Sequence, residues 1–355
     1  MDDSKNQSSE KDKKIESQIY EHQKHLKLNA AEMDDLWSNY MGDSMFSCVF
    51  EHLLEVVKDE EIKDLLLFNQ SLSKRHINTI SELFVKEGIP VPAAFGSSDV
   101  FKGAPRLFED VLMVFYVQQM AIGAFGQYTR ALSTAIRQDV INFYQQGIRE
   151  LNEVYERSTH LLIEKGVIMK TPNIPYPKRV EFVDSRYFNS FFTVKTRPLA
   201  GLEIKYLNLN IATNTLGKAL MMGFAQTASS QKLRNYFKNG WQLSDKQIKQ
   251  YGGILANDNI SSPALMDPHV TDSKVPAFSD KLMLYHVAIA NQLGMENIGI
   301  SMSRTFRHDI FAKYAKFFGE IGLYSNQGQK MMISNGWLEQ PLLAPDRKKA
   351  VRNPL

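Results

Sequence analysis

Four side chains that could do chemistry lie within one short stretch of the sequence: Cys48, Glu51, His52 and Glu55. Residues four apart share one face of a helix, so Cys48 and His52 have the spacing of a thiolate–imidazole pair or of two ligands to a soft metal. A closed metal site needs about four ligands, and the second half of the chain has Ala219 and Gly223 at the equivalent positions. We therefore favour a buried thiol and a surface or interface histidine over a functional site.

A charged pair, Arg137 with Asp139, recurs later in the chain as Arg307 with Asp309. An acidic residue in the first turn of a helix offsets the helix dipole, and a nearby arginine can bridge to a neighbouring helix. This structural interpretation accounts for both copies. The alternative is a site that is present twice.

The sequence predicts no metal centre and no cofactor. A di-iron or di-manganese site in a four-helix bundle takes one Glu from each of two helices and a Glu-x-x-His from each of the other two. No Glu-x-x-His occurs in this chain, and no acidic residue lies between Asp110 and Asp139 or between Lys205 and Asp245. There is also no P-loop, dinucleotide fingerprint or nucleophilic triad pattern.

Composition excludes several classes of protein. The 42 basic and 39 acidic residues give a net charge of +3 and are interspersed, so a nucleic-acid binder is not expected. The single cysteine fits a reducing, cytoplasmic compartment, and the acidic N-terminal stretch "MDDSKNQSSEKDKKIES" predicts no signal peptide. The most apolar stretch is interrupted by Gln118, Gln119 and Gln127, so no membrane span is expected.

The chain repeats itself. Residues 108–144 aligned without a gap on residues 278–314 give nine identities: Phe108/Phe278, Asp110/Asp280, Leu112/Leu282, Met113/Met283, Val117/Val287, Ser133/Ser303, Arg137/Arg307, Asp139/Asp309 and Tyr144/Tyr314. With one residue inserted, the similarity extends upstream, where Ser73 falls on Ser244. Each copy is therefore about the size of a domain, not of a short solenoid repeat.

The apolar periodicity of the first copy is helical throughout and predicts helices over residues 30–57, 60–88, 105–131 and 133–165. Asn29 with Glu32 forms a capping box at the first of these. The first two helices are tightly joined, whereas the Gly- and Pro-rich segment "GIPVPAAFGSSDVFKGA" between the second and third can cross the length of a bundle; the second copy does the same. The sequence thus predicts an all-α protein of two tandem ferritin-like four-helix bundles, each with one long crossover between its second and third helices.

The predicted organisation has five parts: a mobile N-terminal segment (1–28), the first bundle (29–170), a Pro- and aromatic-rich inter-bundle segment (171–198), the second bundle (199–340) and a C-terminal tail (341–355). The inter-bundle segment contains Phe182, Tyr187, Phe188, Phe191 and Phe192. Because these side chains are too apolar for a free tether, we expect the segment to pack across a bundle and fix the two copies together.

The doubled four-helix unit, the phrase "YMGDSMF" at 40–46 and the turn "KEGIPVP" at 86–92 before a long loop resemble domain-of-unknown-function family 3231. The resemblance covers about residues 29–340. It implies a ferritin-like protein of spore-forming bacilli, related to a spore coat F-type protein and associated with sporulation. It brings no catalytic residues.

These observations favour a non-enzymatic structural or interaction protein of unknown biochemical function, cytoplasmic or deposited in the spore coat, with other spore or coat proteins as partners. One alternative is a binding protein for a small apolar ligand, held in a bundle core or in the groove between the bundles. Another is an enzyme that uses Cys48 and His52. The oligomeric state and the placement of the two bundles stay open.

Overall fold

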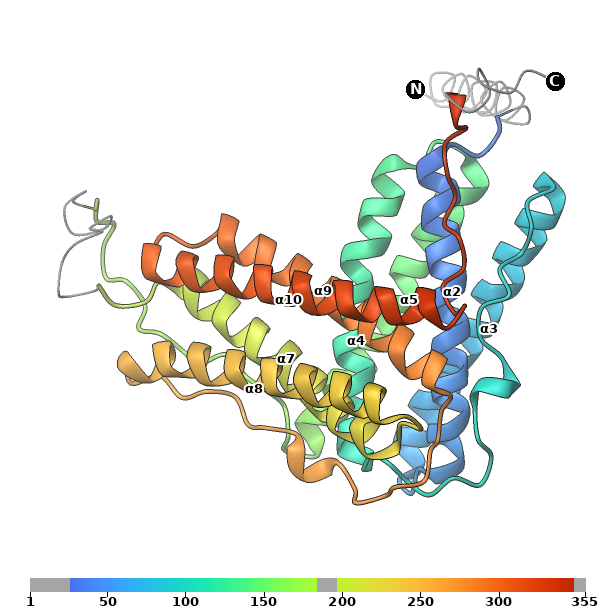
Figure 1. The fold of residues 1–355 in the computed structure, drawn as a ribbon. Helices are drawn as coiled ribbons and strands as arrows, with labels where there is room; N and C mark the ends of the chain where they lie inside the picture. Colours follow the sequence, from blue (N-terminus) through green and yellow to red (C-terminus); the bar gives the residue numbers. More distant parts are fainter. Residues whose placement is uncertain (1–25, 184–196, 348–355) are drawn as a thin grey trace, which may run out of the picture.

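The computed structural model describes residues 26–183 and 197–347, and this part of the chain is all-α. The first bundle contains α2 (Ala30–Val56), α3 (Glu60–Glu87), α4 (Asp110–Thr134) and α5 (Gln138–Glu164), and the second contains α7 (Gly201–Thr227), α8 (Gln231–Asn257), α9 (Asp280–Ser303) and α10 (His308–Ser334). The predicted architecture is confirmed: two tandem four-helix units, each with a long segment between its second and third helices (Figure 1). No helix in the described ranges is long and apolar enough to cross a bilayer.

The helix ends follow from local chemistry. The Asn29 side chain accepts the Glu32 N–H, and the Glu32 carboxylate accepts the Asn29 N–H, so the predicted capping box is present. Asp59 caps α3 by accepting two N–H groups. Gly88 ends the same helix at a positive φ of 68°, a conformation that glycine adopts without a Cβ penalty.

The third helix begins at Asp110, five residues later than the predicted start at residue 105. The backbone just before Asp110 is occupied elsewhere: the carbonyl of Leu107 accepts the Thr271 N–H at 3.0 Å, and the Glu109 N–H donates to the His269 carbonyl at 2.9 Å. Both partners belong to the second crossover. Pairing between the two crossovers therefore replaces the first turn that the sequence pattern predicts.

The two crossovers pair about a local pseudo-two-fold axis. The Phe101 N–H donates to the Ala277 carbonyl at 2.9 Å, which is the symmetric counterpart of the Thr271–Leu107 bond 170 residues along the chain. Two isolated antiparallel bridges join Val100 with Phe278 and Phe108 with Val270. Adding 170 to the first residue of each bridge gives the second residue of the other. A contact in which position i of one copy meets position j of the other, and the reverse, is the pattern of an isologous dimer interface.

Helices α4 and α9 meet near this axis through residues at equivalent positions. The Tyr116 hydroxyl lies 2.9 Å from Nε2 of His286, which is its counterpart in the second copy. A Cβ added at Gly123 would lie 2.8 Å from Cδ1 of its counterpart Leu293, so the backbone of α4 approaches that side chain closely. Figure 1 shows the result, with the two bundles crossing rather than lying parallel.

Two aromatic side chains in the described part of the inter-bundle segment are exposed. Tyr176 and Phe182 are 95% and 96% exposed, so the expectation of packing is wrong for Phe182. The remaining aromatic residues of the segment lie outside the described residues: Tyr187, Phe188, Phe191 and Phe192. Residues 1–25 and 348–355 also lie outside them. The chain after α10 contacts the first crossover. There the Glu339 carboxylate accepts the N–H groups of Ala93 and Ala94 at 3.0 and 2.6 Å.

Replacement of Phe278 by alanine should destabilise the whole molecule. Phe278 is 1% exposed and lies at the crossover bridge, 5.2 Å from His52 of the first bundle between ring centroids. Loss of a buried phenylalanine costs about 3–5 kcal/mol of unfolding free energy, measured by urea denaturation. The matched control is Phe182→Ala at an exposed position, where we expect a change within about 0.5 kcal/mol. Equal effects of the two variants would contradict the conclusion that packing of the crossover against the other bundle stabilises the molecule.

Candidate functional site

The structure places Cys48 in the core of the first bundle, where its thiol donates to the Gly96 carbonyl at 3.4 Å. Burial, together with the nearby carboxylates of Asp99 and Glu51, raises the pKa of Cys48 to about 12. The reactive form of cysteine is the thiolate, so this thiol is almost entirely unreactive at neutral pH. The interpretation as a buried thiol agrees with this geometry.

His52 is completely buried at the contact with the second bundle. Its ring packs edge-on against Phe278, and no hydrogen-bond partner among the described residues reaches either ring nitrogen. Burial lowers the pKa of His52 to about 4, against a small opposing effect of Glu55. At Gly223, the equivalent position of the second bundle, an added Cβ would lie 2.7 Å from the Phe108 ring. Each of these positions therefore receives the phenylalanine of the other copy's crossover.

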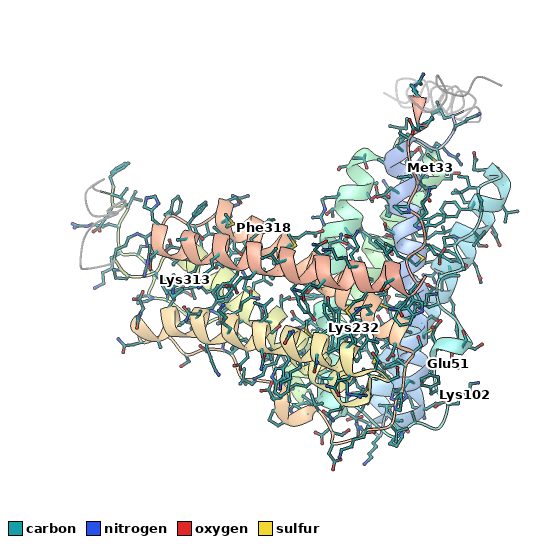
Figure 2. All side chains as sticks on the ribbon, viewed as in Figure 1. Met33, Glu51, Lys102, Lys232, Lys313 and Phe318 are labelled. Atoms are coloured by element: carbon teal, nitrogen blue, oxygen red, sulfur yellow. The ribbon has the colours of Figure 1, made fainter. Side chains whose placement is uncertain are left out.

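The two glutamates of this cluster contact the first crossover and not the thiol or the imidazole. Glu51 lies 3.7 Å from Nζ of Lys102, and Figure 2 shows the two residues near each other at the edge of the molecule. Glu55 accepts the Gly103 N–H at 3.3 Å. The four residues singled out in the sequence thus have separate partners.

Arg137 and Asp139 belong to a junction that holds one end of the first bundle. The Arg137 guanidinium donates to Asp139 and to Glu87 at the end of α3, while the Arg137 N–H donates to Glu32 at 2.9 Å. Glu32 also accepts the Ile136 N–H, although it is only 1% exposed. Three helix ends meet at these charge-assisted bonds.

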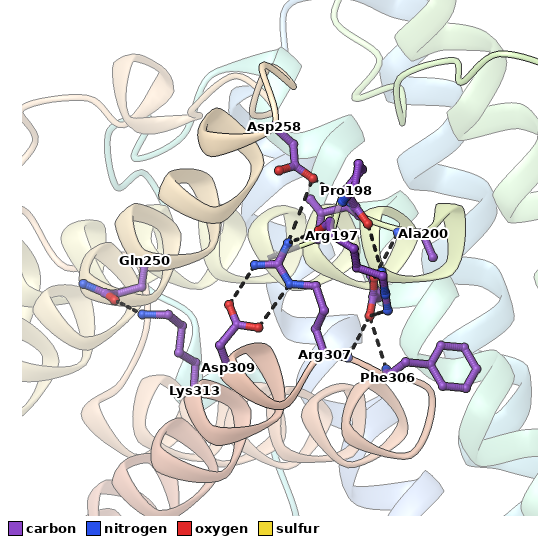
Figure 3. A network of polar contacts seen from close by, with 11 residues as sticks. Arg197, Pro198, Ala200, Gln250, Asp258, Phe306, Arg307, Asp309 and Lys313 are labelled. Atoms are coloured by element: carbon purple, nitrogen blue, oxygen red, sulfur yellow. Dashed lines mark hydrogen bonds and ion pairs between the residues drawn. The ribbon is translucent and has the colours of Figure 1, made fainter. Parts of the chain in front are cut away.

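The second bundle repeats this junction, as Figure 3 shows. Arg307 donates to Asp309 at 3.1 and 2.8 Å and lies 4.0 Å from Asp258, the counterpart of Glu87. Glu203 accepts the Arg307 N–H and is also bound by both terminal nitrogens of Arg197. Burial favours protonation of Glu203, but these hydrogen bonds outweigh it and hold its pKa below the usual range. In both copies the repeated Arg–Asp pair therefore lies where helix ends meet and bonds to groups from more than one of them.

A different polar cluster, which the sequence pattern does not reveal, lies in the middle of the first bundle. His76 of α3 stands between two carboxylates: Nδ1 is 3.2 Å from Asp43 of α2, and Nε2 is 2.8 Å from Glu150 of α5. The Tyr128 hydroxyl of α4 lies 3.3 Å from the same Nδ1, and Arg75 donates to Glu150 from the surface side. All four helices of the bundle contribute to this cluster.

The charges of the cluster support one another. Burial would lower the pKa of His76, but the charges and hydrogen bonds of Asp43 and Glu150 outweigh it and raise the pKa to about 9. Glu150 is likewise disfavoured as an anion by burial, yet its bond to His76 keeps its pKa below the usual range. At neutral pH the cluster therefore contains an imidazolium between two carboxylates.

A cavity of about 160 Å³ adjoins this cluster, and both Asp43 and His76 line it. The rest of its wall is largely apolar and comes from both bundles, because Tyr285, Ile289 and Leu293 of α9 close one side. A mostly apolar hollow with a few convergent polar groups is the usual form of a small-molecule site. The cavity exists in this form only because the second copy packs against the first.

The second bundle has an uncharged version of the same arrangement. The counterparts of Asp43 and His76 are Asn214 and Gln247, and the Asn214 amide lies 3.4 Å from the Gln247 oxygen. Ile298 replaces the tyrosine, and only the outer ion pair persists, as Lys246 with Glu320 at 2.8 Å. The cavity beside these residues is about 60 Å³. The two bundles thus share a fold but differ in the chemistry of their cores.

Metal binding by the cluster is not favoured by its geometry. Both ring nitrogens of His76 face carboxylates, and residues 26–183 and 197–347 contain no group of three or more His, Cys, Asp or Glu side chains placed to hold an ion. Sequence spacing missed the cluster because its members are far apart in the chain. The available signal was polar residues inside apolar helical stripes, such as Asp43 within "YMGDSMF".

The fold and its polar junctions define a class: an all-α protein in which two copies of a four-helix bundle are fused in tandem. The chain belongs to the family described as "Protein of unknown function (DUF3231)", which it matches twice, over residues 18–180 and 189–350. The family predicted from the sequence is confirmed.

Among solved structures, the chain is similar to a "putative spore coat protein" from Bacillus halodurans. The two share 17% sequence identity with a TM-score of 0.40, and the similarity covers 42% of this chain and 98% of that one. No curated protein matches this chain.

The imidazole of His76 should titrate with a midpoint near pH 9 in the folded protein. Because this pKa lies above the ordinary value of 6.5, protonated His76 stabilises the folded state. This contribution to the unfolding free energy is complete below about pH 6.5 and is lost as the pH rises to about 9. Histidine NMR signals followed from pH 5 to 10 measure the midpoint. In His76→Gln, which copies the second bundle, the unfolding free energy should vary less over the same window. A midpoint at or below 6.5 would contradict the buried ion pairs.

Proposed function

We propose that this chain is a non-enzymatic structural or interaction protein. The observation that carries the proposal is the duplicated junction: Glu32 with Arg137 and Glu203 with Arg307 use their charges to brace the same helix ends in both bundles. Charged side chains that recur with these bonds have a structural task in each copy.

The strongest candidates for catalysis support the same proposal. The Cys48 thiol is protonated at neutral pH because its pKa is about 12, and the His52 imidazole, with a pKa of about 4, is a weak base. A nucleophilic cysteine needs a lowered pKa and a base within hydrogen-bond reach. His52 instead packs against Phe278 of the other bundle.

The association with sporulation is part of the proposal and rests on the family resemblance of the "YMGDSMF" phrase and the long crossover. We expect the protein to accumulate when its source organism sporulates and to be extracted with the spore coat. Immunoblots of coat extracts, with decoated spores and vegetative cells as controls, measure this. Absence from both sporulating cells and spores would contradict it.

A second candidate function is the binding of a small ligand, and the cavity of about 160 Å³ in the first bundle favours it. A hollow of about 150 Å³ in another protein binds benzene, so the size is adequate for a single ring. If the protein retains such a ligand, native mass spectrometry should show a mass increment that disappears on denaturation. A native mass equal to that of the bare chain, in protein purified without detergent, would count against a retained ligand.

A further inference from the structure

We propose that the cavity of the first bundle binds a small amphiphile that is uncharged or positively charged and donates a hydrogen bond to Asp43 from its one polar end. The proposal rests on the second candidate function and names the chemical class of its ligand. It follows from three properties of the cavity: its size, its largely apolar lining, and the presence of the Asp43 carboxylate among the few polar side chains that line it.

The size of the cavity sets the size of the ligand. Its volume of about 160 Å³ is close to that of a hollow of about 150 Å³ that takes up benzene. The apolar wall includes Phe46, Phe50, Val117 and Val154 from the first bundle, and Leu293 from the second. A six-membered ring or a short branched chain can lie against these side chains, and one further carbon can carry a polar group to the polar side chains of the same cavity.

The polar wall gathers Asp43, His76 and Tyr128, with Asn69 and Ser73 beside them. Oδ2 of Asp43 is engaged with His76, and a carboxylate has a second oxygen that accepts further hydrogen bonds. The two ring nitrogens of His76 face Asp43 and Glu150, so the imidazolium has no N–H left for a ligand. The charged group available at this wall is therefore the Asp43 carboxylate, an acceptor.

The side chains at the polar end disfavour anions, because both ring nitrogens of the His76 cation face carboxylates and Asp43 is the charged group left to meet a ligand. A ligand carboxylate would be placed beside the Asp43 carboxylate, which lines the cavity, and like charges repel. An alcohol or ammonium group donates to Asp43 instead and gains a charge-assisted hydrogen bond. The second bundle offers Asn214 in place of Asp43, in a cavity of about 60 Å³, and cannot provide an equivalent site.

Four compounds that share one ring test the proposal: benzylamine, benzyl alcohol, toluene and benzoate. Dissociation constants for the full chain at pH 7 come from NMR titration. We expect benzylamine and benzyl alcohol to bind, benzoate to bind at least about ten-fold more weakly than benzylamine, and the shifts to centre on α2, α3 and α4 near the cavity. Shifts confined to the surface would overturn the site, even if a compound binds.

The variant Asp43→Asn should weaken benzylamine binding about ten-fold or more, because a hydrogen bond to a charged group is replaced by a neutral one, while toluene affinity changes less than about three-fold. The matched control Asn214→Asp makes the reverse change in the second bundle and should leave every affinity unaltered. If Asp43→Asn does not fold, Tyr128→Phe removes one hydroxyl from the same wall and should weaken benzyl alcohol more than toluene.

The outcomes separate this inference from the proposal on which it rests. If toluene and benzoate bind in the cavity as tightly as benzylamine, or if Asp43→Asn leaves benzylamine affinity unchanged, the cavity is a ligand site but the inference about its polar end is wrong. If none of the four compounds binds in the cavity, the small-ligand function falls with it. The structural proposal stands in either case.

Discussion

Pairing between the two crossover segments is the constraint on which the rest of this structure depends. Each bundle needs a long irregular segment to join its second and third helices, and such a segment carries backbone N–H and C=O groups that must find partners where it is buried. Here each crossover supplies partners for the other, through the bonds of Phe101 with Ala277 and of Thr271 with Leu107. The connection that defines the bundle also joins the two bundles.

Fusion in one chain lets the two sides of this interface differ, which an interface between identical subunits does not allow. Where a true two-fold axis would place identical residues opposite each other, the chain has Tyr116 against His286 and Gly123 against Leu293. Leu293 is also part of the wall of the first cavity. Leu293 lines the cavity of the second bundle as well, so the asymmetric interface contributes to the wall of both cavities.

Periodicity, caps and loop lengths predicted the helices, the duplication and the crossovers, because these depend on neighbours in the chain. The start of α4 was predicted five residues too early because the contacts that decide it come from the other copy. Phe182 was expected to pack because it is apolar, and it is exposed. The cluster around His76 escaped prediction because its partners, Asp43 and Glu150, lie on other helices of the same bundle, far away in the sequence. Spacing along one helix revealed only Cys48 and His52, which contact different partners in the fold.

The second bundle shows that the charges around His76 are not a requirement of the fold. Asn214 and Gln247 occupy the positions of Asp43 and His76, and the helices around them pack in the same arrangement. Buried ion pairs cost desolvation free energy that uncharged groups of similar shape avoid, so they are weak devices for stability. Since the second bundle folds with uncharged side chains at these positions, the charged side chains of the first bundle need an explanation other than folding. Its position on the wall of the larger cavity makes recognition of a ligand the most direct reason.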